Sequence, residues 1–319
     1  MRGINMRRLL ILITAIALLA AGGFLLYGFG QGEPQNPTIV RLDRPAAPPP
    51  HQPLHYERII SLAPSITEVL FSLGLGDRVV GVTRYCDYPP EALEKPKIGG
   101  YFDINYEAII TAAPDLVVLM KEHDKPREYL KRLGIETLTV DHSSVDGIME
   151  SIRLIGEKTG TKKTADKILM ETEKRIERVK AMTKDLNKPT VMVAVGRSLQ
   201  TGAAGAVYIS GRDGFYDELI SMAGGINAYA KDTLKFPALS AEGVARLNPQ
   251  VIIEMVPDVT DPQTDEKMLE KWRSIPGLTA VSKGRVYVLN QDYVVVPGPR
   301  FILLLERMAE VIHPEAHWE

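Results

Sequence analysis

Short hydrophobic runs alternate with longer stretches of helical periodicity along most of this chain. The runs are rich in branched aliphatic residues, as buried strands are, and the stretches between them place apolar residues three or four positions apart. The predicted strands are 58–62, 135–140, 190–195 and 285–289, and the predicted helices are 65–74, 145–158, 215–223 and 300–312. Strands that alternate with helices predict a small parallel sheet in each half of the chain.

Local signals refine two of these segments. Ser65-Ile-Thr-Glu68 has the Ser-x-x-Glu spacing of a capping box, in which two side chains bond free backbone N–H groups at a helix start, and Gly74 closes that helix. In the second half, the stretch from Gly196 to Gly214 is predicted to be a long loop between a strand and a helix.

Two passages, 105–120 and 240–255, match each other without a gap. In both, a polar capping residue precedes a short helix, a proline stops that helix, and an apolar run predicts a buried strand. The paired residues are the caps Asn105 and Ser240, the prolines Pro114 and Pro249, and the first-turn glutamates Glu107 and Glu242. The chain is therefore predicted to consist of two similar lobes with a cleft between them.

The connection between the two copies has a helical pattern of its own. Residues 162–186 lack glycine and proline and place apolar side chains at helical spacing, which predicts one helix of roughly 37 Å at ~1.5 Å per residue. A single helical strut between two lobes resists wide hinge bending, whereas crossing loops would permit it. We therefore expect opening motions of only a few degrees.

The N-terminal region is basic at first and then strongly apolar. Arg7 and Arg8 precede an apolar run from Leu9 to Phe29, which as a helix reaches about 31 Å, close to the ~30 Å hydrocarbon core of a bilayer. The run is longer than a usual signal-peptide core, so an uncleaved anchor is favoured over a cleaved export signal. Positive residues on the short N-terminal side place the bulk of the chain outside the cytoplasm.

A proline-rich stretch follows this region and predicts an extended tether. The whole chain then divides into five parts. They are the signal or membrane anchor 1–30, the tether 31–57, the first lobe 58–160, the bridging helix 161–187 and the second lobe 188–319.

Composition limits the chemistry of the chain. With 319 residues, of which 45% are hydrophobic and 24% charged, it can bury two cores, and a formal net charge of −2 gives no reason to expect a nucleic-acid partner. The single cysteine, Cys86, excludes an intramolecular disulfide and a multi-thiolate metal site, and it lies too far from the N-terminal segment for a lipidated cysteine there. Neither a phosphate-binding loop nor a Gly-x-Ser-x-Gly elbow occurs, so no catalytic residue is predicted and ATP hydrolysis is assigned to a partner.

Three motifs and the repeated units form a recognisable set. The motifs are Arg58-Ile-Ile-Ser-Leu-Ala-Pro-Ser-Ile-Thr-Glu68, Thr83-Arg-Tyr-Cys-Asp-Tyr-Pro-Pro90 and Pro297-Gly-Pro-Arg300. Together they resemble the substrate-binding proteins of ABC importers for vitamin B12 and ferric siderophores, over residues 58 to about 313. The resemblance implies two Rossmann-like α/β lobes bridged by one long helix, a metal chelate in the cleft, and a permease with its ATPase subunit as partners. In that family one surface glutamate per lobe docks on permease arginines, and Glu107 and Glu242 match those positions.

The loops beyond the carboxyl ends of the strands are the candidate ligand site, because ligands of open parallel sheets bind there. Tyr85, Tyr101 and Phe236 match positions at which vitamin B12-binding members place aromatic side chains against the corrin. Tyr101 and Phe236 stand where tryptophan is familiar, and Met120 stands at another aromatic position. Tyr293 lies in a further strand-end loop.

The same loops also contain arginines, which siderophore-binding members commonly use for anionic ligands. The candidates are Arg84, Arg197 and Arg300, with Arg212 nearby. Arg300 also begins the last predicted helix and could brace the Pro-Gly-Pro turn before it. These residues keep an anionic iron chelate open as the ligand.

The sequence therefore predicts an extracytoplasmic, membrane-tethered and monomeric solute-binding protein that captures a corrinoid and delivers it to an ABC importer. The alternative ligands are a ferric siderophore or haem. More remote alternatives are a ligand sensor and a chelatase-like enzyme, in which Asp141 and His142 would imitate a metal-inserting pair. No cofactor and no protein-built metal site is expected, because no pair of histidines has helical metal-ligand spacing.

Overall fold

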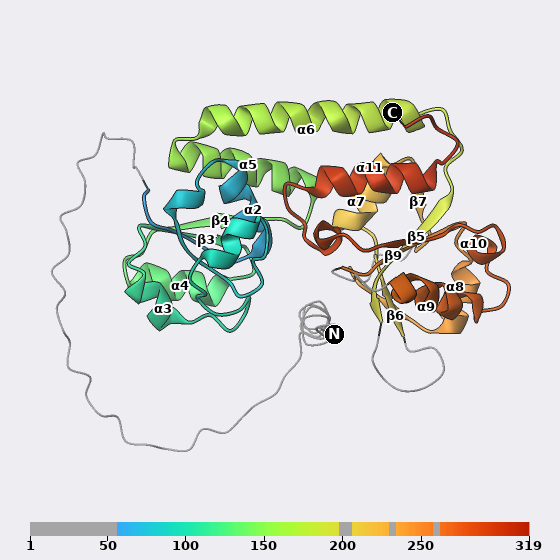
Figure 1. Cartoon of the computed structure of the whole chain (residues 1–319), viewed down its shortest axis with the longest axis horizontal. Helices are drawn as coiled ribbons and strands as arrows, with labels where there is room; N and C mark the ends of the chain where they lie inside the picture. Colours follow the sequence, from blue (N-terminus) through green and yellow to red (C-terminus); the bar gives the residue numbers. More distant parts are fainter. Residues whose placement is uncertain (1–55, 198–205, 230–233, 258–261, 319) are drawn as a thin grey trace, which may run out of the picture.

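Two α/β lobes lie side by side below a long helix, α6 (Lys162–Thr183), which confirms the predicted fold class (Figure 1). The computed structural model describes residues 56–197, 206–229, 234–257 and 262–318. The predicted anchor and nearly all of the predicted tether lie outside these ranges. Within them, no helix combines the length and the apolar character needed to cross a bilayer.

The first lobe is built on a parallel sheet with the strand order β2-β1-β3-β4. Its elements are β1 (Ile59–Ser61), α2 (Pro64–Ser72), η1 (Gly76–Arg78), β2 (Val79–Val82), η2 (Pro90–Glu94), α3 (Tyr106–Thr111), β3 (Leu116–Met120), α4 (Asp124–Arg132), β4 (Thr137–Val140) and α5 (Val145–Thr159). Alternate residues of β3 enter two cores, one against α2 and α5 and the other against α3 and α4. A strand that is apolar throughout is buried on both faces in this way.

The second lobe has a mixed sheet with the order β10-β9-β5-β6-β8, and β7 pairs with the start of β5. Its elements are β5 (Thr190–Arg197), β6 (Val207–Ile209), α7 (Phe215–Met222), β7 (Ile226–Asn227), β8 (Ala238–Leu239), α8 (Ala241–Leu247), β9 (Val251–Met255), α9 (Pro262–Arg273), α10 (Thr279–Ser282), β10 (Val286–Leu289), η3 (Asp292–Val295) and α11 (Phe301–Ile312). Strands β10, β9 and β5 are parallel, whereas β6 and β8 are antiparallel to their neighbours.

The stretch from Gly196 to Gly214 was predicted to be a loop, and this prediction is wrong because the stretch contains β6. The parallel sheet predicted for this lobe is present as β10, β9 and β5, and β6 and β8 extend it as antiparallel strands. A strand of three residues with alternating burial is too short to stand out as a hydrophobic run.

The two repeated passages fold into the same unit, α3 with β3 and α8 with β9. Asn105 caps α3 by accepting a hydrogen bond from the Ala108 N–H at 3.0 Å, and Ser240 caps α8 by accepting one from the Gly243 N–H at 3.2 Å. In both copies a proline follows the helix and a fully buried strand follows the proline. The predicted caps, proline stops and strands are therefore confirmed.

Two helices, rather than one, join the lobes. Helix α6 packs against α5 and against α11, so it covers both lobes as predicted. Helix α5 also belongs to both: Val145 and Ile148 in its first turns lie in the core of the second lobe, while Ile152 and Ile155 lie in the core of the first. The single predicted strut is therefore a pair of packed helices, which makes the bridge stiffer against bending.

The predicted capping box at the start of α2 does not form. Ala63 is the N-cap and makes no side-chain capping bond, and Pro64 occupies the first helical position. The Ser65 hydroxyl instead lies 2.8 Å from a ring nitrogen of His142, and Glu68 accepts hydrogen bonds from Arg300. Tertiary partners thus replace the local bonds that the spacing predicted.

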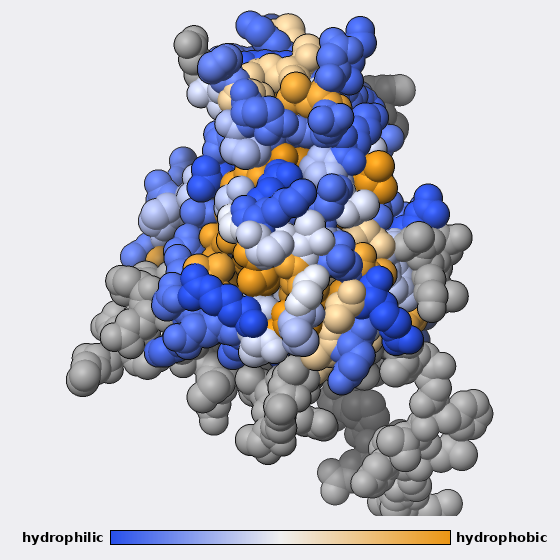
Figure 2. Space-filling view, turned by 90° about the vertical axis from the view of Figure 1, so that its right-hand side faces the viewer, coloured by the Kyte–Doolittle hydropathy of each residue, from blue (hydrophilic) through white to orange (hydrophobic). Residues whose placement is uncertain are grey.

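The surface shows hydrophilic residues interrupted by hydrophobic ones. Figure 2, which looks onto the end of the second lobe, shows mainly hydrophilic residues in the upper part of this face, and hydrophobic residues exposed among hydrophilic ones in its middle. In the first lobe, the side chain of Phe102 is 52% exposed, and it lies beside the predicted ligand residue Tyr101. An exposed ring at that place is of interest because it adjoins a candidate site.

Candidate functional site

Tyr101 lies at the centre of an aromatic cluster in the first lobe. Its ring packs against His123 with a centroid distance of 4.6 Å and meets the edge of Phe102 at 4.8 Å. Its hydroxyl donates a hydrogen bond to Glu122 Oε1 at 2.5 Å. Burial and the neighbouring Glu122 carboxylate raise the pKa of Tyr101, so the phenol stays protonated at neutral pH.

His123 is a buried neighbour that the sequence analysis did not single out. Its Nδ1 accepts a hydrogen bond from the Met120 N–H at 3.3 Å, so the neutral ring carries its proton on Nε2. Burial lowers the pKa of His123, which favours that neutral form. Met120 itself is only 6% exposed at the end of β3 and packs into the core of the first lobe.

Arg84 and Tyr85 follow β2 and face solvent to different degrees. Arg84 is exposed and pairs with Asp103, with 2.6 Å between Nη2 and Oδ2. Its guanidinium carbon lies 5.9 Å from the centroid of the Tyr85 ring, which is half-buried. This corner of the first lobe thus presents an aromatic ring beside an arginine whose charge is already neutralised.

Arg197 lies at the end of β5 and takes part in a nearly buried ion pair. Its Nε and Nη2 donate to the two carboxylate oxygens of Glu254 at 2.6 Å and 2.8 Å, and the side chains are 16% and 4% exposed. The Trp272 indole N–H also donates to Glu254, and the Arg197 guanidinium lies 4.4 Å from the Trp272 ring centroid. Sequence reasoning missed Glu254 and Trp272, because nothing in an apolar strand or a polar helix shows which distant residue it faces.

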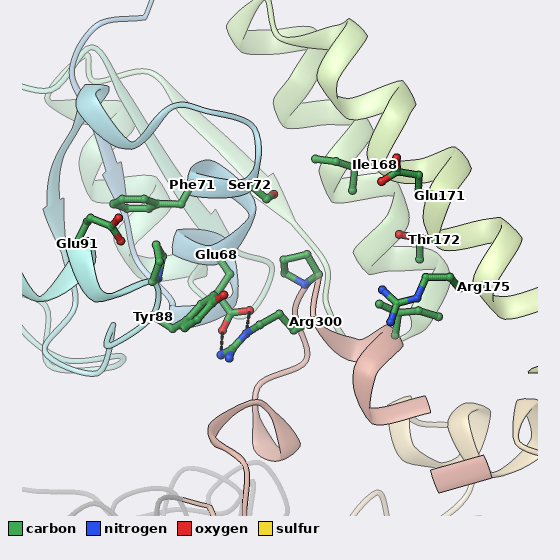
Figure 3. A pocket seen from close by; sticks show the side chains of 13 residues that line it. Glu68, Phe71, Ser72, Tyr88, Glu91, Ile168, Glu171, Thr172, Arg175 and Arg300 are labelled. Carbon is green, nitrogen blue, oxygen red and sulfur yellow. Dashed lines mark hydrogen bonds and ion pairs between the residues drawn. The ribbon is translucent and has the colours of Figure 1, made fainter. Parts of the chain in front are cut away.

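Arg300 lies between the lobes, and its guanidinium contacts two carboxylates and two tyrosine rings. Its Nε and Nη2 donate to Glu68 at 3.0 Å and 2.7 Å (Figure 3). Its Nη1 donates to both oxygens of Asp292 at 2.9 Å and 2.7 Å. The rings of Tyr88 and Tyr293 lie 3.6 Å and 5.5 Å from its guanidinium carbon. Ligand contact by Arg300 stays a prediction, and it would require this guanidinium to leave one of these partners.

A pocket of about 500 Å³ lies beside Arg300, between α2, α6 and the start of α11 (Figure 3). Phe71 and Tyr88 line it from the first lobe, and Ile168 and Arg175 line it from α6. Of the predicted ligand residues only Arg300 lines it. The pocket therefore adjoins the interlobe contact, and the segments that follow β2 and β10 line part of it.

Phe236 and Tyr293 contribute rings from the second lobe. Both are half-buried and pack against its core, Phe236 with its ring centroid 6.4 Å from that of Tyr216 and Tyr293 within η3. Each therefore keeps part of its ring accessible while the rest is held by packing. Their contact with a ligand stays a prediction.

Asp141 and His142, the pair that could imitate a chelatase, are committed to other partners. The ring nitrogens of His142 lie 2.8 Å from the hydroxyls of Ser65 and Ser151, and burial lowers the pKa of His142 to about 4. Partial burial opposes ionisation of Asp141, but hydrogen bonds led by that from Lys121 at 2.5 Å hold its pKa below the usual range. Among the described residues, no group of three or more metal-ligating side chains is placed to hold an ion.

The two candidate docking glutamates are both exposed. Glu107 lies in the first turn of α3 and Glu242 in the first turn of α8. Both helices lie on the side of the molecule that faces away from α6 (Figure 1). Hydrogen bonding with Ser240 lowers the pKa of Glu242, so this carboxylate stays charged at neutral pH.

Comparisons with known proteins agree with this architecture. The sequence profile of a periplasmic binding protein family matches residues 59–293. Over 272 residues the chain is 34% identical to an uncharacterized ABC transporter substrate-binding lipoprotein of Bacillus subtilis, and the match covers 82% of each chain.

Two solved structures have the same fold. One is the periplasmic vitamin B12 binding protein of Vibrio cholerae, with a TM-score of 0.69, 27% identity, and coverage of 81% of this chain and 97% of that one. The other is a periplasmic heme-binding protein of Roseiflexus sp. RS-1 in its apo form, with a TM-score of 0.68, 26% identity, and coverage of 82% and 99%. Proteins named for two different ligands, vitamin B12 and heme, therefore share the fold of this chain.

Proposed function

The chain belongs to the periplasmic binding protein family, and on that premise we propose that it captures a corrinoid between its lobes and delivers it to an ABC importer. The family and the relatives named above are binding proteins rather than enzymes, so the chelatase alternative is set aside. In this proposal the ligand-binding lobes are 58–160 and 188–319, and 161–187 is the bridge.

The choice of ligand rests on one observation, that the arginines of the predicted site are already paired with carboxylates. Arg84, Arg197 and Arg300 are each already paired with a carboxylate, two of them in nearly buried pairs. A polyanionic chelate gains little from neutralised guanidinium groups, and separating a buried pair costs several kcal/mol. The predicted site therefore suits a ligand that carries little negative charge.

The aromatic side chains support the same choice. Tyr85 and Tyr101 in the first lobe and Phe236 in the second are half-buried rings, and Tyr101 and Phe236 are held by packing against the cores of their lobes. Such rings offer wide apolar area at a low entropic cost, which suits a large, flat and mostly neutral ligand. A corrin ring has these properties, and the Vibrio cholerae structure provides a relative named for vitamin B12.

Haem and ferric siderophores are the second candidates, because a heme-binding protein shares the fold. Haem iron takes a histidine, thiolate or phenolate side chain as its ligand. In the aromatic cluster of the first lobe, Tyr101 stays protonated and hydrogen-bonded to Glu122, and the neutral His123 carries its proton on the nitrogen that would have to bind iron. At this cluster, both observations favour the corrinoid.

Attachment to the membrane is proposed through the N-terminal segment. The Bacillus subtilis relative is named a lipoprotein, but the one cysteine of this chain, Cys86, is fully buried in the core of the first lobe. The buried thiol cannot carry a lipid that enters a bilayer. An apolar anchor at 1–30 and a tether at 31–57 would hold the folded part outside the cytoplasm.

A transport experiment tests this function in cells that contain the permease and its ATPase. Glu107→Lys with Glu242→Lys is expected to reduce cobalamin uptake at least about tenfold, because like charges at the docking surface cost several kcal/mol. Corrinoid binding by the purified variant should be unchanged. The matched control reverses two other exposed glutamates, Glu128 on α4 and Glu270 on α9, and should leave uptake intact.

Different outcomes separate the parts of the proposal. If the variant loses corrinoid binding as much as it loses uptake, the assignment of docking to these glutamates is wrong. If the wild-type protein binds a corrinoid but supports no uptake at all, the sensor alternative replaces transport. If uptake of a ferric chelate, and not of cobalamin, depends on the protein, the ligand belongs to the iron class.

A further inference from the structure

The lobes are joined directly by a contact that is distinct from the bridging helices. Glu68 lies in α2 of the first lobe, and Arg300 lies just before α11 of the second. Their two parallel hydrogen bonds form a bidentate pair, in which the side chains are 3% and 13% exposed. The pair is therefore largely shielded from solvent, and Figure 3 shows the two side chains facing each other.

The surroundings hold this pair in one geometry. Tyr88 of the first lobe lies against the guanidinium at 3.6 Å, so the arginine is bound by two first-lobe side chains at once. Gly298 brings the backbone of the second lobe against α2. A Cβ at Gly298 would lie 3.2 Å from Glu68 Oε2 and 3.3 Å from Ser65 Cβ, which leaves almost no room for a side chain.

We propose that Glu68 and Arg300 form an interlobe clamp that holds the two lobes at one angle. Such a clamp positions the two faces of the cleft relative to each other, and it sets the distance between Glu107 and Glu242. The consequences for ligand and permease rest on the proposed function, whereas the clamp itself does not.

The chemistry of the pair suits a positioning role. A bidentate arginine–carboxylate pair depends strongly on orientation, and rotation of one lobe about α6 would break both hydrogen bonds together. A separated pair would leave two buried charged groups without partners, so intermediate angles are disfavoured. The packed helices α5 and α6 allow small sliding motions, and the clamp selects one position among them.

Two features of the surroundings would allow the Glu68–Arg300 pair to separate and to form again. Asp292 binds Arg300 from the same lobe and keeps the guanidinium directed when Glu68 moves away. The adjoining pocket of about 500 Å³, lined by Tyr88 and Arg300 among others, gives these side chains room to move. Asp292 therefore orients the arginine, and Glu68 provides the link between lobes.

Distance measurements between spin labels test the clamp without any ligand. Labels are placed at Glu107→Cys and Glu242→Cys, in a background in which the buried Cys86 is changed to alanine. Glu68→Gln is expected to broaden the distance distribution and shift its mean. Asp292→Asn is the matched control, because it removes a carboxylate from the same arginine but leaves the link between lobes, and it should keep the wild-type distribution.

A second variant tests the clamp if Glu68→Gln folds poorly. Gly298→Ala removes no charge, but its Cβ pushes the second-lobe backbone away from α2, so it should shift the distribution in the same way. A wild-type distribution in both Glu68→Gln and Gly298→Ala would overturn the clamp. Equal broadening in Asp292→Asn would overturn it too, because the effect would then not depend on the link between lobes.

Ligand titration of the same variants links the clamp to function. If loss of the clamp reduces the binding-competent arrangement to about a tenth of the molecules, the apparent Kd for cyanocobalamin rises about tenfold. A shifted distance distribution without any corrinoid binding by the wild-type protein would reject the ligand and leave the clamp. Normal corrinoid binding with an unchanged distribution would reject the clamp and leave the ligand.

Discussion

Ala113 and Asn248 occupy the same position in the two copies of the repeated unit, and their backbone φ angles, 42° and 43°, are almost identical. Both lie in the left-handed region, directly before the proline that separates the helix from the strand in each unit. This conformation costs an L-residue roughly 1–2 kcal/mol, and asparagine adopts it more readily than alanine. Each lobe thus has the same left-handed turn, and only the second lobe has a side chain suited to it.

Ala113→Asn is expected to raise the free energy of unfolding by about 0.5–1 kcal/mol, because asparagine relieves part of the left-handed strain. Urea denaturation measures the change. The reciprocal variant Asn248→Ala should lose more than this, since Asn248 Oδ1 also accepts a hydrogen bond from the Thr279 N–H at 2.8 Å. A destabilising Ala113→Asn change would show that the alanine conformation is not strained.

The repeated unit also shows how far sequence reasoning could reach. The caps, the proline stops and the buried strands were predictable because each depends on residues only a few positions apart. The left-handed residue before each proline was not, since alanine has no preference for that conformation. The capping box at Ser65 and Glu68 failed because both side chains bind partners 77 and 232 positions away.

For the candidate site, the sequence led to residues but not to their partners. The strand-end rule led to Tyr85, Tyr101 and Phe236, and the structure shows each of them half-buried. The pairing of the arginines could not be predicted, because a carboxylate such as Glu254 lies within an apolar strand and its facing residue depends on the whole sheet. The charge of the site, which guides the choice of ligand, is therefore a property of the tertiary structure.

The two arginine pairs at strand ends should differ greatly in their contribution to stability. Arg197→Met is expected to lower the free energy of unfolding by about 3 kcal/mol, because the Glu254 carboxylate would remain buried without its positively charged partner. Arg84→Met removes an exposed pair and should cost less than about 1 kcal/mol. Urea denaturation of both variants gives the comparison. Equal losses would contradict the structural role of Arg197.

The stability of the protein should fall as the pH falls, in a window set by His142. Burial lowers the pKa of His142 from 6.5 to about 4, so the unfolded chain takes up the proton first. The contribution is present above about pH 6.5, is lost progressively down to about pH 4, and amounts to ~3 kcal/mol. Urea denaturation at pH 7 and pH 4.5 should show a smaller loss for His142→Gln than for the wild type. Parallel losses in both proteins would assign the acid sensitivity to other groups.

The aromatic side chains should contribute to affinity through their rings. Tyr85→Ala and Phe236→Ala are each expected to weaken corrinoid binding about tenfold, which corresponds to about 1.4 kcal/mol of lost contact. Tyr85→Phe keeps the ring and should bind as the wild type does. Fluorescence titration with cyanocobalamin measures all three. Unchanged affinity in both alanine variants would move the ligand away from these rings.

Calorimetric titration of a protein that begins near residue 31 tests the central proposal most directly. The ligands are cyanocobalamin, cobinamide, haemin and a panel of ferric siderophores. Tight one-to-one binding of the corrinoids and no heat with the anionic iron chelates are expected. Silence with both corrinoids, together with one-to-one binding of an iron chelate, would contradict the proposal and would show that the paired arginines open to receive an anion.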